Sequence, residues 1–576
     1  MLINTIEEEQ MTNKINYNRR QFIQHSALGA AALSAFPGTL FAKTGQMKNK
    51  ATPGFNPDIE IEFSTKNAYI PILKNGAKTK VQKYYAKLLK GPKNCLVELE
   101  NNYLGPILNY TQGQKVRIYY HNRLSEPSII HWHGLHVPQH ADGHPMYSIG
   151  TGESYVYEFE VMNRAGTSFY HSHSHNLTAE QVYKGLAGII TVTDEHEQKL
   201  DLPSGEYDLP LVIQDRTFNN RNQLQYLRGM HGKMTGFLGE TILVNGTPDA
   251  EFSVKSRAYR FRAVNGSNSR IYKLGWDDGT PITAIGTDAG LLAKPETRPY
   301  IMLASGERVD LWLDFSNRPV GSKLVMYSLP FQGAMPPMME QKRQGMKSGG
   351  MGGGMMGGGM GMMGGGLAQG DKFPIATFKV TEKVSDSPAL PKKLVPFKRL
   401  TERDVDNKNK PIPIGISMKP MRPQLNGKSF SMDRVMDIER VKLGSIKKIK
   451  IFHDHGTMGT RKMDGDKEMD KGMNMQGGGG MGMMGGGMAM SMAHPIHLHG
   501  QQFQILSREI EGMRQEEYKT VSEGFINSGW KDTVLVMPGE EIIIAKPFED
   551  YKGLFLYHCH NLEHEDLGMM RQFYIG

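Results

Sequence analysis

Short runs of alternating apolar and polar residues, each broken by Gly, Pro, Asn or Asp, recur along this chain from residue 55 onward. A period of two is typical of β-strands with one buried face, and no long segment shows the 3.6-residue period of an amphipathic helix. Eight such runs predict strands at 115–122, 154–161, 188–194, 259–265, 308–315, 446–452, 541–548 and 553–558. Many short strands joined by turns predict an all-β chain of sandwiches or barrels.

The chain has 576 residues, enough for three or four domains of ordinary size. Links that contain proline occur near 195–207 and 383–396. We therefore predict three β-domains, at 55–200, 205–385 and 395–576.

Two segments rich in Gly and Met lie inside the second and third predicted domains, at 334–370 and 456–493. They contain almost no β-branched or aromatic residues to bury, so neither can offset the entropy lost on ordering. We expect both to be flexible insertions.

The N-terminus has the features of an export signal. NRRQFIQ (18–24) contains a twin-arginine pair, an apolar run follows at 26–36, and LFA (40–42) offers a cleavage site. The apolar run is too short to span a bilayer. We predict a twin-arginine signal peptide over 1–42, starting at Met1 or Met11. The twin-arginine export machinery would then deliver the mature protein to the periplasm without membrane insertion.

Charge and cysteine content narrow the class of partner. The formal net charge is +9, but Lys and Arg are scattered, which indicates a solvated surface and no nucleic-acid partner.

The two cysteines are Cys95 and Cys559. Cys95 alternates within a strand-like run and is predicted to be a buried, inert thiol. Because Cys559 has another role, described next, we do not expect a disulfide.

Histidines gather in four motifs: HWHG (131–134), YHSHSH (170–175), HPIHLHG (494–500) and HCHNLEHEDLGMM (558–570). Each contains an H-x-H pair, whose side chains share one face of a strand. Two imidazoles on one face can bind one metal ion or two adjacent ions. Four such pairs predict a metal centre built from both ends of the β-rich region.

The last motif is the most specific. Cys559 should point to the face opposite His558 and His560, so its thiolate would bind a different metal ion. His564 and Met569 follow it, and His494 stands apart from the pair at 497 and 499. Two His, one Cys and a weak Met make a type 1 copper site.

Eight imidazoles remain, a number that suits a three-copper cluster with open positions for dioxygen. They are His131, His133, His171, His173, His497, His499, His558 and His560. Because Cys559 is bonded to two of them through the backbone, electrons would have a short route between the sites.

With these motifs the chain resembles the multicopper oxidases, above all the bacterial periplasmic copper-efflux oxidases and copper-resistance proteins, which are related to laccases. The four motifs occur in the family's order. The likeness extends from about 60 to 576 and includes ADGHP (141–145), GERVDLWLDF (306–315) and GWKDTV (529–534). It implies three cupredoxin-like Greek-key β-sandwich domains and four copper ions, with the trinuclear cluster between the first and third domains.

The resemblance also implies a role for each ligand. Type 1 copper takes His494, Cys559, His564 and Met569, and type 2 copper takes His131 and His497. The type 3 pair takes His133, His171, His173, His499, His558 and His560, and His175 is left outside. Asp142 and Glu565 match positions of acids that deliver protons to the cluster.

The methionines before the third motif suggest a substrate site. Thioethers are soft ligands that suit Cu(I). Met488, Met490 and Met492 would hold a substrate copper, although the resembled efflux oxidases have an Asp where Met490 stands. The alternative is an inert Gly-rich insertion, or a loop that covers the type 1 site.

The sequence therefore predicts a monomeric oxidase that couples oxidation of Cu(I), and of phenols, to reduction of dioxygen to water in copper tolerance. A laccase-type oxidase of phenols, aromatic amines, Mn(II) or Fe(II) is the alternative. A periplasmic copper-storage protein is a third hypothesis, which the complete ligand set disfavours.

Overall fold

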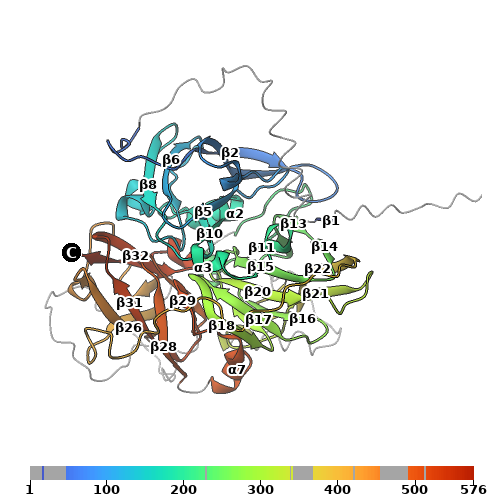
Figure 1. Cartoon of the computed structure of the whole chain (residues 1–576). Helices are drawn as coiled ribbons and strands as arrows, with labels where there is room; N and C mark the ends of the chain where they lie inside the picture. Colours follow the sequence, from blue (N-terminus) through green and yellow to red (C-terminus); the bar gives the residue numbers. More distant parts are fainter. Residues whose placement is uncertain are drawn as a thin grey trace, which may run out of the picture.

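Three pairs of β-sheets make up most of the computed structural model (Figure 1). The structure describes residues 16–17, 47–227, 230–337, 339–340, 367–419, 422–454, 491–510 and 514–576. The predicted signal peptide, apart from 16–17, and most of both Gly/Met-rich segments lie outside the described residues.

The first pair of sheets, blue to cyan in Figure 1, contains a four-stranded and a five-stranded sheet. The four-stranded sheet has the order β3-β2-β6-β8, with strands Thr79–Lys90, Ile59–Ile70, Lys115–Asn122 and Ser154–Glu160. The other has the order β4-β5-β10-β9-β7, with strands Leu96–Val97, Ile107–Thr111, Ala187–Thr193, Gly166–Ser172 and Ile130–His131.

The second pair, green to yellow in Figure 1 apart from the short blue strand β1, is the largest. One sheet has the order β13-β12-β11-β15-β20-β17-β18: Thr247–Pro248, Thr241–Val244, Asp208–Arg216, Ala258–Asn265, Arg308–Asp314, Ile282–Thr287 and Gly290–Arg298. The other has the order β1-β14-β22-β21-β16-β19: Asn16–Tyr17, Glu251–Lys255, Phe373–Glu382, Lys323–Ser328, Tyr272–Trp276 and Ile301–Leu303.

The third pair, orange to red in Figure 1, lies beside the first. One sheet has the order β24-β23-β26-β31-β28-β29: Arg422–Leu425, Ile412–Lys419, Ser445–His453, Glu540–Phe548, Phe503–Ile510 and Trp530–Lys531. The other has the order β25-β33-β32-β27-β30: Arg440–Val441, Met570–Ile575, Gly553–Cys559, His494–Leu498 and Thr533–Val536.

Each pair of sheets encloses its own apolar core. In the first pair, Ile61 and Ile118 of one sheet and Leu108 and Ile190 of the other belong to one buried cluster. Similar clusters fill the second and third pairs. Burial of apolar side chains from two facing sheets is the stabilising arrangement of a β-sandwich. The all-β, cupredoxin-like sandwich fold predicted from the sequence is confirmed.

The eight strands predicted from alternation are also confirmed. The clearest is β6, in which every second residue from Val116 to Asn122 is buried. Cys95 is buried and unpaired, as predicted, and Cys559 is also a free thiol. The domain boundaries at 200 and 385–395 stay a prediction, although strands β10 and β11 lie on either side of the first link and β22 and β23 on either side of the second.

Helices in the described residues are short. The α-helices are α2 Thr178–Lys184, α3 Glu195–Gln198, α4 Met230–Thr235, α7 Gln515–Lys519 and α8 Leu562–Asp566. The 3₁₀ helices are η2 Lys93–Cys95, η3 Gln139–Ala141, η4 Pro145–Tyr147, η5 Gly205–Tyr207, η6 Asp437–Glu439 and η7 Ser522–Gly524. Among the described residues, none of these helices combines the length and the hydropathy that crossing a membrane requires.

Candidate metal centre

The ends of four strands bring the eight predicted cluster histidines together. Strand β7 pairs with β9 so that His131 lies opposite His171, and β27 pairs with β32 so that His497 lies opposite His558. The other member of each H-x-H pair lies two residues further on. All eight side chains are at most 2% exposed. The first pair of sheets and the third therefore contribute four imidazoles each to one buried site.

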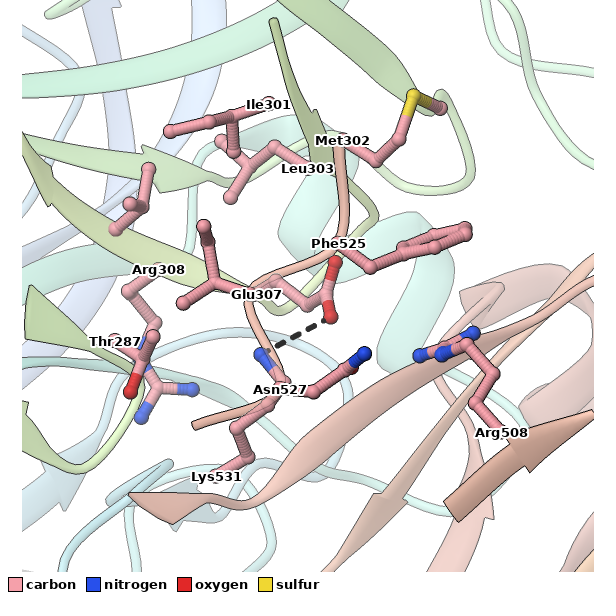
Figure 2. Close-up of a pocket in the computed structure, with 12 residues that line it drawn as sticks. Thr287, Ile301, Met302, Leu303, Glu307, Arg308, Arg508, Phe525, Asn527 and Lys531 are labelled. Atoms are coloured by element: carbon pink, nitrogen blue, oxygen red, sulfur yellow. Dashed lines mark ion pairs between the residues drawn. The ribbon is translucent and has the colours of Figure 1, made fainter. Parts of the chain in front are cut away.

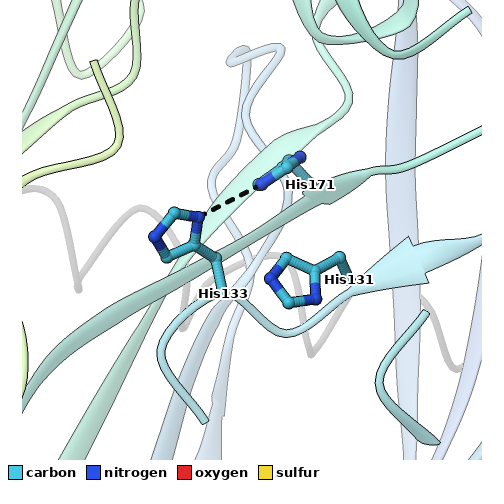
Figure 3. Close-up of side chains that lie close together, drawn as sticks. All are labelled: His131, His133 and His171. Carbon is cyan, nitrogen blue, oxygen red and sulfur yellow. Dashed lines mark hydrogen bonds between the residues drawn. The ribbon is translucent and has the colours of Figure 1, made fainter. Parts of the chain in front are cut away.

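Imidazole nitrogens from different motifs approach one another closely. Nε2 of His131 lies 3.3 Å from Nε2 of His497, and Nε2 of His499 lies 3.1 Å from Nε2 of His558. Figure 3 shows the third approach, in which Nδ1 of His133 lies 3.4 Å from Nε2 of His171. These distances place potential ligand atoms within 4.8 Å of one another.

Hydrogen bonds on the outer side of the rings determine which nitrogen faces inward. Nδ1 of His131 donates to the backbone oxygen of Asp142 at 2.6 Å, and Nδ1 of His497 donates to that of Asp532 at 2.9 Å. Five more outer nitrogens lie near an oxygen, those of His133, His171, His499, His558 and His560. A neutral imidazole carries one hydrogen, so the inner nitrogen of each of these seven rings has a free lone pair. The outer nitrogen of the eighth ring, His173, has no hydrogen-bond partner among the described residues.

The donor set therefore fits bound cations. Two lone pairs about 3 Å apart repel each other, and a metal ion between them removes the repulsion. Imidazole nitrogen suits copper, and an outer hydrogen bond that fixes the tautomer is usual for a histidine ligand. Burial lowers the pKa of seven of these rings, and that of His497 to about 4, which favours the neutral, ligating form.

A second donor set lies on the other face of β32. Nδ1 of His494 is 3.4 Å from Sγ of Cys559, and Nδ1 of His564 is 3.8 Å from the same sulfur. All three are buried, and burial raises the pKa of the Cys559 thiol. Such a thiol ionises when a metal ion displaces its proton. Met569 is buried in the same core, and its backbone bonds to both Cys559 and His564.

The two donor sets are covalently joined. His558 and His560 lie with the eight histidines, whereas Cys559 between them lies with His494 and His564. This is the alternation that the HCH motif predicts for a strand.

The two predicted acids both lie against cluster histidines. Oδ2 of Asp142 accepts a hydrogen bond from Nδ1 of His499 at 2.8 Å. Oε2 of Glu565 lies 3.2 Å from Nδ1 of His558, and its Oε1 lies 3.7 Å from Nε2 of His173. Both carboxyls are at most 2% exposed, and burial raises the pKa of Asp142 and raises that of Glu565 well above its usual range.

Sequence reasoning missed Asp532, Arg308 and Ser305. Oδ1 of Asp532 accepts from Nε2 of His133 at 3.0 Å and from Arg308 at 2.7 Å. Burial alone would raise the pKa of Asp532, but Arg308 and His133 hold it well below its usual range. Asp532 lies in GWKDTV and Arg308 in GERVDLWLDF. Both motifs belong to the family resemblance, but the resemblance assigned no role to these two residues.

The remaining predicted residues are placed as follows. His175 is exposed and lies outside both donor sets. Met492 is 4% exposed, and its backbone oxygen accepts from Nε2 of His453 at 2.9 Å. Met488 and Met490 lie outside the described residues.

Two family models, both described as "Multicopper oxidase", match residues 80–197 and 452–576. The chain is 28% identical to "Multicopper oxidase mco" of Staphylococcus aureus, over 86% of this chain and 88% of that protein. It is 29% identical to a laccase of Bacillus subtilis, over 78% of this chain and 80% of the laccase.

Among solved structures, the McoA multicopper oxidase of Aquifex aeolicus superposes with a TM-score of 0.68 at 29% identity. The match covers 91% of this chain and 97% of that one. These similarities reach all three pairs of sheets.

Proposed function

Because this chain belongs to the multicopper oxidase family and is therefore an oxidoreductase that uses dioxygen, we propose that it oxidises Cu(I) in copper tolerance, with dioxygen reduced to water. The observation that carries the proposal is the pair of donor sets joined through Cys559. A store for copper needs ligands, but it does not need a type 1 set covalently continuous with eight imidazoles.

The donor sets would hold four copper ions. His494, Cys559, His564 and Met569 would hold type 1 copper, and His131 and His497 type 2 copper. The type 3 pair would be held by His133, His171, His173, His499, His558 and His560. Bound there, copper supplies single-electron acceptance at the first set and four-electron delivery to dioxygen at the second.

The position of His494 supports a small reductant such as Cu(I). Nε2 of His564 donates to the backbone oxygen of Met234 at 3.1 Å, so the second pair of sheets covers that edge. Nε2 of His494 has no hydrogen-bond partner within the described part of the chain. His494 directly follows residues 491–493, where the second Gly/Met-rich segment ends. We infer that electrons enter at His494.

Both Gly/Met-rich segments are anchored beside this entry point. The backbone N–H of Ala493 donates to the oxygen of Ala334 at 2.9 Å. Arg514 donates to the backbone oxygens of Met335, at 3.0 Å, and Ser491, at 3.3 Å. One guanidinium therefore holds the root of each segment, which supports delivery of Cu(I) by thioethers, among them our candidates Met488, Met490 and Met492.

Reduction of one dioxygen to two waters consumes four protons, and we assign their delivery to Asp142 and Glu565. The contacts to His499 and His558 place a buried carboxyl against two different cluster ligands. Burial raises the pKa of both carboxyls, which favours the protonated form that can pass its proton to a stronger base.

The deciding experiment measures dioxygen uptake by copper-loaded protein with Cu(I) and with a small phenol, before and after deletion of 458–488. We expect the deletion to slow Cu(I) oxidation and to leave phenol oxidation unchanged or faster. The matched control is a full-length variant in which every methionine of the deleted segment is changed to Leu: Met458, Met463, Met469, Met473, Met475, Met481, Met483, Met484 and Met488. It separates loss of thioethers from loss of a covering loop. Unchanged rates on both substrates in both variants would refute Cu(I) delivery and covering alike.

A laccase-type oxidation of phenols, aromatic amines, Mn(II) or Fe(II) is the second candidate, because relatives from two Bacillus species are named laccases. It is favoured if kcat/KM for the phenol exceeds that for Cu(I) in the intact protein.

We further propose a monomer exported to the periplasm by the twin-arginine machinery. The support is the order of twin arginines, apolar run and cleavage site in 18–42. Changing Arg19 and Arg20 to Lys should retain the precursor in the cytoplasm, which cell fractionation measures.

A further inference from the structure

The turn Ser305–Arg308 follows β19 in the second pair of sheets and ends at Arg308, the first residue of β20. It lies against histidines of both other pairs. This part of the molecule supplies none of the eight predicted cluster ligands. Ser305 reaches His560, and Arg308 reaches Asp532, which bonds to His133 and His497. The turn is therefore in contact with the cluster from outside.

Ser305 fixes the tautomer of His560. Its hydroxyl donates to the backbone oxygen of Ser267 at 2.5 Å, so the lone pairs of Oγ remain for His560. Nδ1 of His560 lies 3.1 Å from Oγ and must be the donor. The inner Nε2 of His560 then carries the free lone pair, and it has no other partner among the described residues.

Gly306 lets the turn approach this ring. Its φ is +84°, and a Cβ there would lie 2.8 Å from Cγ of His560. Any larger residue would push His560 away or strain the backbone. The glycine of GERVDLWLDF is thus required by contact with a cluster histidine.

Arg308 acts on His133 through Asp532. The guanidinium binds both carboxylate oxygens of Asp532, and Oδ1 also accepts from Nε2 of His133. A carboxylate only accepts, so the hydrogen of His133 must be on Nε2 and the lone pair on Nδ1, which faces His171. The backbone oxygen of Asp532 sets His497 in the same way.

The arginine is itself held rigidly. Its remaining donors reach the backbone oxygens of Thr167 at 3.2 Å, Gly306 at 2.9 Å and Asp288 at 2.7 Å. Gly134 of HWHG admits this arrangement, since a Cβ there would lie 2.3 Å from Arg308 and 3.0 Å from Asp532.

A second ion pair braces the turn. Glu307 and Lys531 lie 3.2 Å apart at a cavity of about 20 Å³, which has room for about one water molecule. Figure 2 shows this ion pair among the residues that line the cavity. Lys531 also lies 3.0 Å from Asp288. Burial opposes its charge, but the two carboxylates raise the pKa of Lys531, so the ammonium persists beside Asp532 in the chain.

We propose that Ser305 and Arg308 are positioning residues for the oxygen-reducing cluster, which determine the inward nitrogen of His560 and of His133. This rests on the proposed function, because it presumes that the eight histidines bind copper. Groups that fix the tautomer of a histidine ligand typically change metal affinity by about 10- to 100-fold when they are removed.

The test measures copper per chain in competition with a chelator, together with electron paramagnetic resonance, on Ser305→Ala, Arg308→Lys and Arg308→Met. We expect Ser305→Ala and Arg308→Met to lower the copper affinity of the cluster about 10- to 100-fold, while type 1 blue absorption remains. Arg308→Met should also change the type 2 signal, because Asp532 bonds to the proposed type 2 ligand His497, whereas Ser305 reaches the proposed type 3 ligand His560. Arg308→Lys should lie between them and the wild type, since lysine keeps the charge but loses the planar fork.

Arg270→Met is the matched control. Arg270 and its partner Asp215 are as buried as Arg308 and Asp532, with Nε and Oδ2 2.7 Å apart. It should lower the unfolding midpoint in urea as Arg308→Met does, without changing the copper affinity of the cluster. The proposal is overturned if Ser305→Ala and Arg308→Met keep the wild-type affinity within twofold, or if Arg270→Met weakens it equally. A wild type that binds only type 1 copper would instead refute the proposed function.

Discussion

At the scale of single residues, the partner of the outer nitrogen separates cluster histidines from other buried histidines. His499 donates to Asp142 and presents its second nitrogen to other imidazoles. His144 is just as buried, but its two nitrogens contact Gln572 and the backbone of Met146. Burial therefore does not separate the proposed metal ligands from other histidines, whereas a ring nitrogen that faces other imidazoles does.

Replacement of Asp142 tests proton delivery. Asp142→Asn keeps an oxygen for Nδ1 of His499 but cannot release a proton. We expect dioxygen uptake to fall by about 100-fold or more and its pH profile to change, with copper content intact. Asp386→Asn, at an exposed carboxylate, is the control. An unchanged rate and pH profile in fully copper-loaded D142N would exclude the role.

His144 should make stability depend on pH. Burial lowers the pKa of His144 to about 4 in the folded chain, against about 6.5 when unfolded. Between these values the unfolded state binds the extra proton, so stability falls as pH drops from 6.5 to 4, by up to about 3 kcal/mol. In copper-loaded protein, His144→Gln should flatten this dependence in urea denaturation, and exposed His196→Gln should not. Equal slopes in H144Q and wild type would contradict the assignment.

At the scale of elements, α8 is a helix of only five residues that contacts all three pairs of sheets. It carries His564 of the proposed type 1 set. Glu563 accepts from the backbone N–H of Phe237 at 3.0 Å and from Asn268 at 2.8 Å in the second pair. Asp566 accepts from the first residues of α2 in the first pair. The segment that follows Cys559 thus supplies both proposed copper ligands and interdomain contacts.

Removal of the Asp566 carboxylate tests this contact. Its two oxygens accept from the N–H groups of Thr178 and Ala179, each at 3.0 Å, and so cap α2. We expect Asp566→Ala to cost about 1–2 kcal/mol of unfolding free energy, and Asp566→Asn less because one acceptor remains. Urea denaturation measures both. If D566A and D566N were as stable as the wild type, the cap would contribute nothing.

At the scale of the whole molecule, the eight clustered histidines come from two β-sandwiches, the first and third pairs of sheets. The second pair, the middle sandwich, contacts them from outside. Each outer sandwich supplies four imidazoles, and Arg308 of the middle one bonds to Asp532. Interdomain apolar contacts such as those of Leu104, Phe169 and Leu243 add to this assembly. Copper binding is therefore expected to stabilise the arrangement of domains as well as supply redox chemistry.

Removal of copper tests this coupling. A ligand that binds only the folded state at 1,000 times its Kd adds about 4 kcal/mol to stability. We expect the chelated protein to unfold at a lower temperature in calorimetry and to regain its midpoint on reloading. Cys559→Ser, which removes the thiolate of the type 1 set alone, should lose only part of this difference. Identical midpoints with and without copper would show that the domains are held without the metal.

What the sequence determined by itself is local. Alternation over 115–122 predicted β6, because a half-buried strand needs one apolar face. The H-x-H pairs and the opposite direction of Cys559 follow from the same period of two. The family's motifs added a role for each ligand, which the geometry supports as a proposal.

Only the tertiary structure determined which groups form hydrogen bonds with the outer nitrogens of the histidine rings. Asp532 lies 224 residues from Arg308, and Met234 lies 330 residues from His564. Whether such groups meet depends on how whole sandwiches pack. A hydrogen bond is lost when donor and acceptor move apart by about 1 Å, so the packing must be accurate to that distance. No local sequence pattern determines packing at that accuracy. Short-range periodicity in the sequence therefore predicted the candidate ligands. The hydrogen-bond partners that determine which ring nitrogen faces inward, such as Asp532, come from distant segments that meet only when the sandwiches pack together.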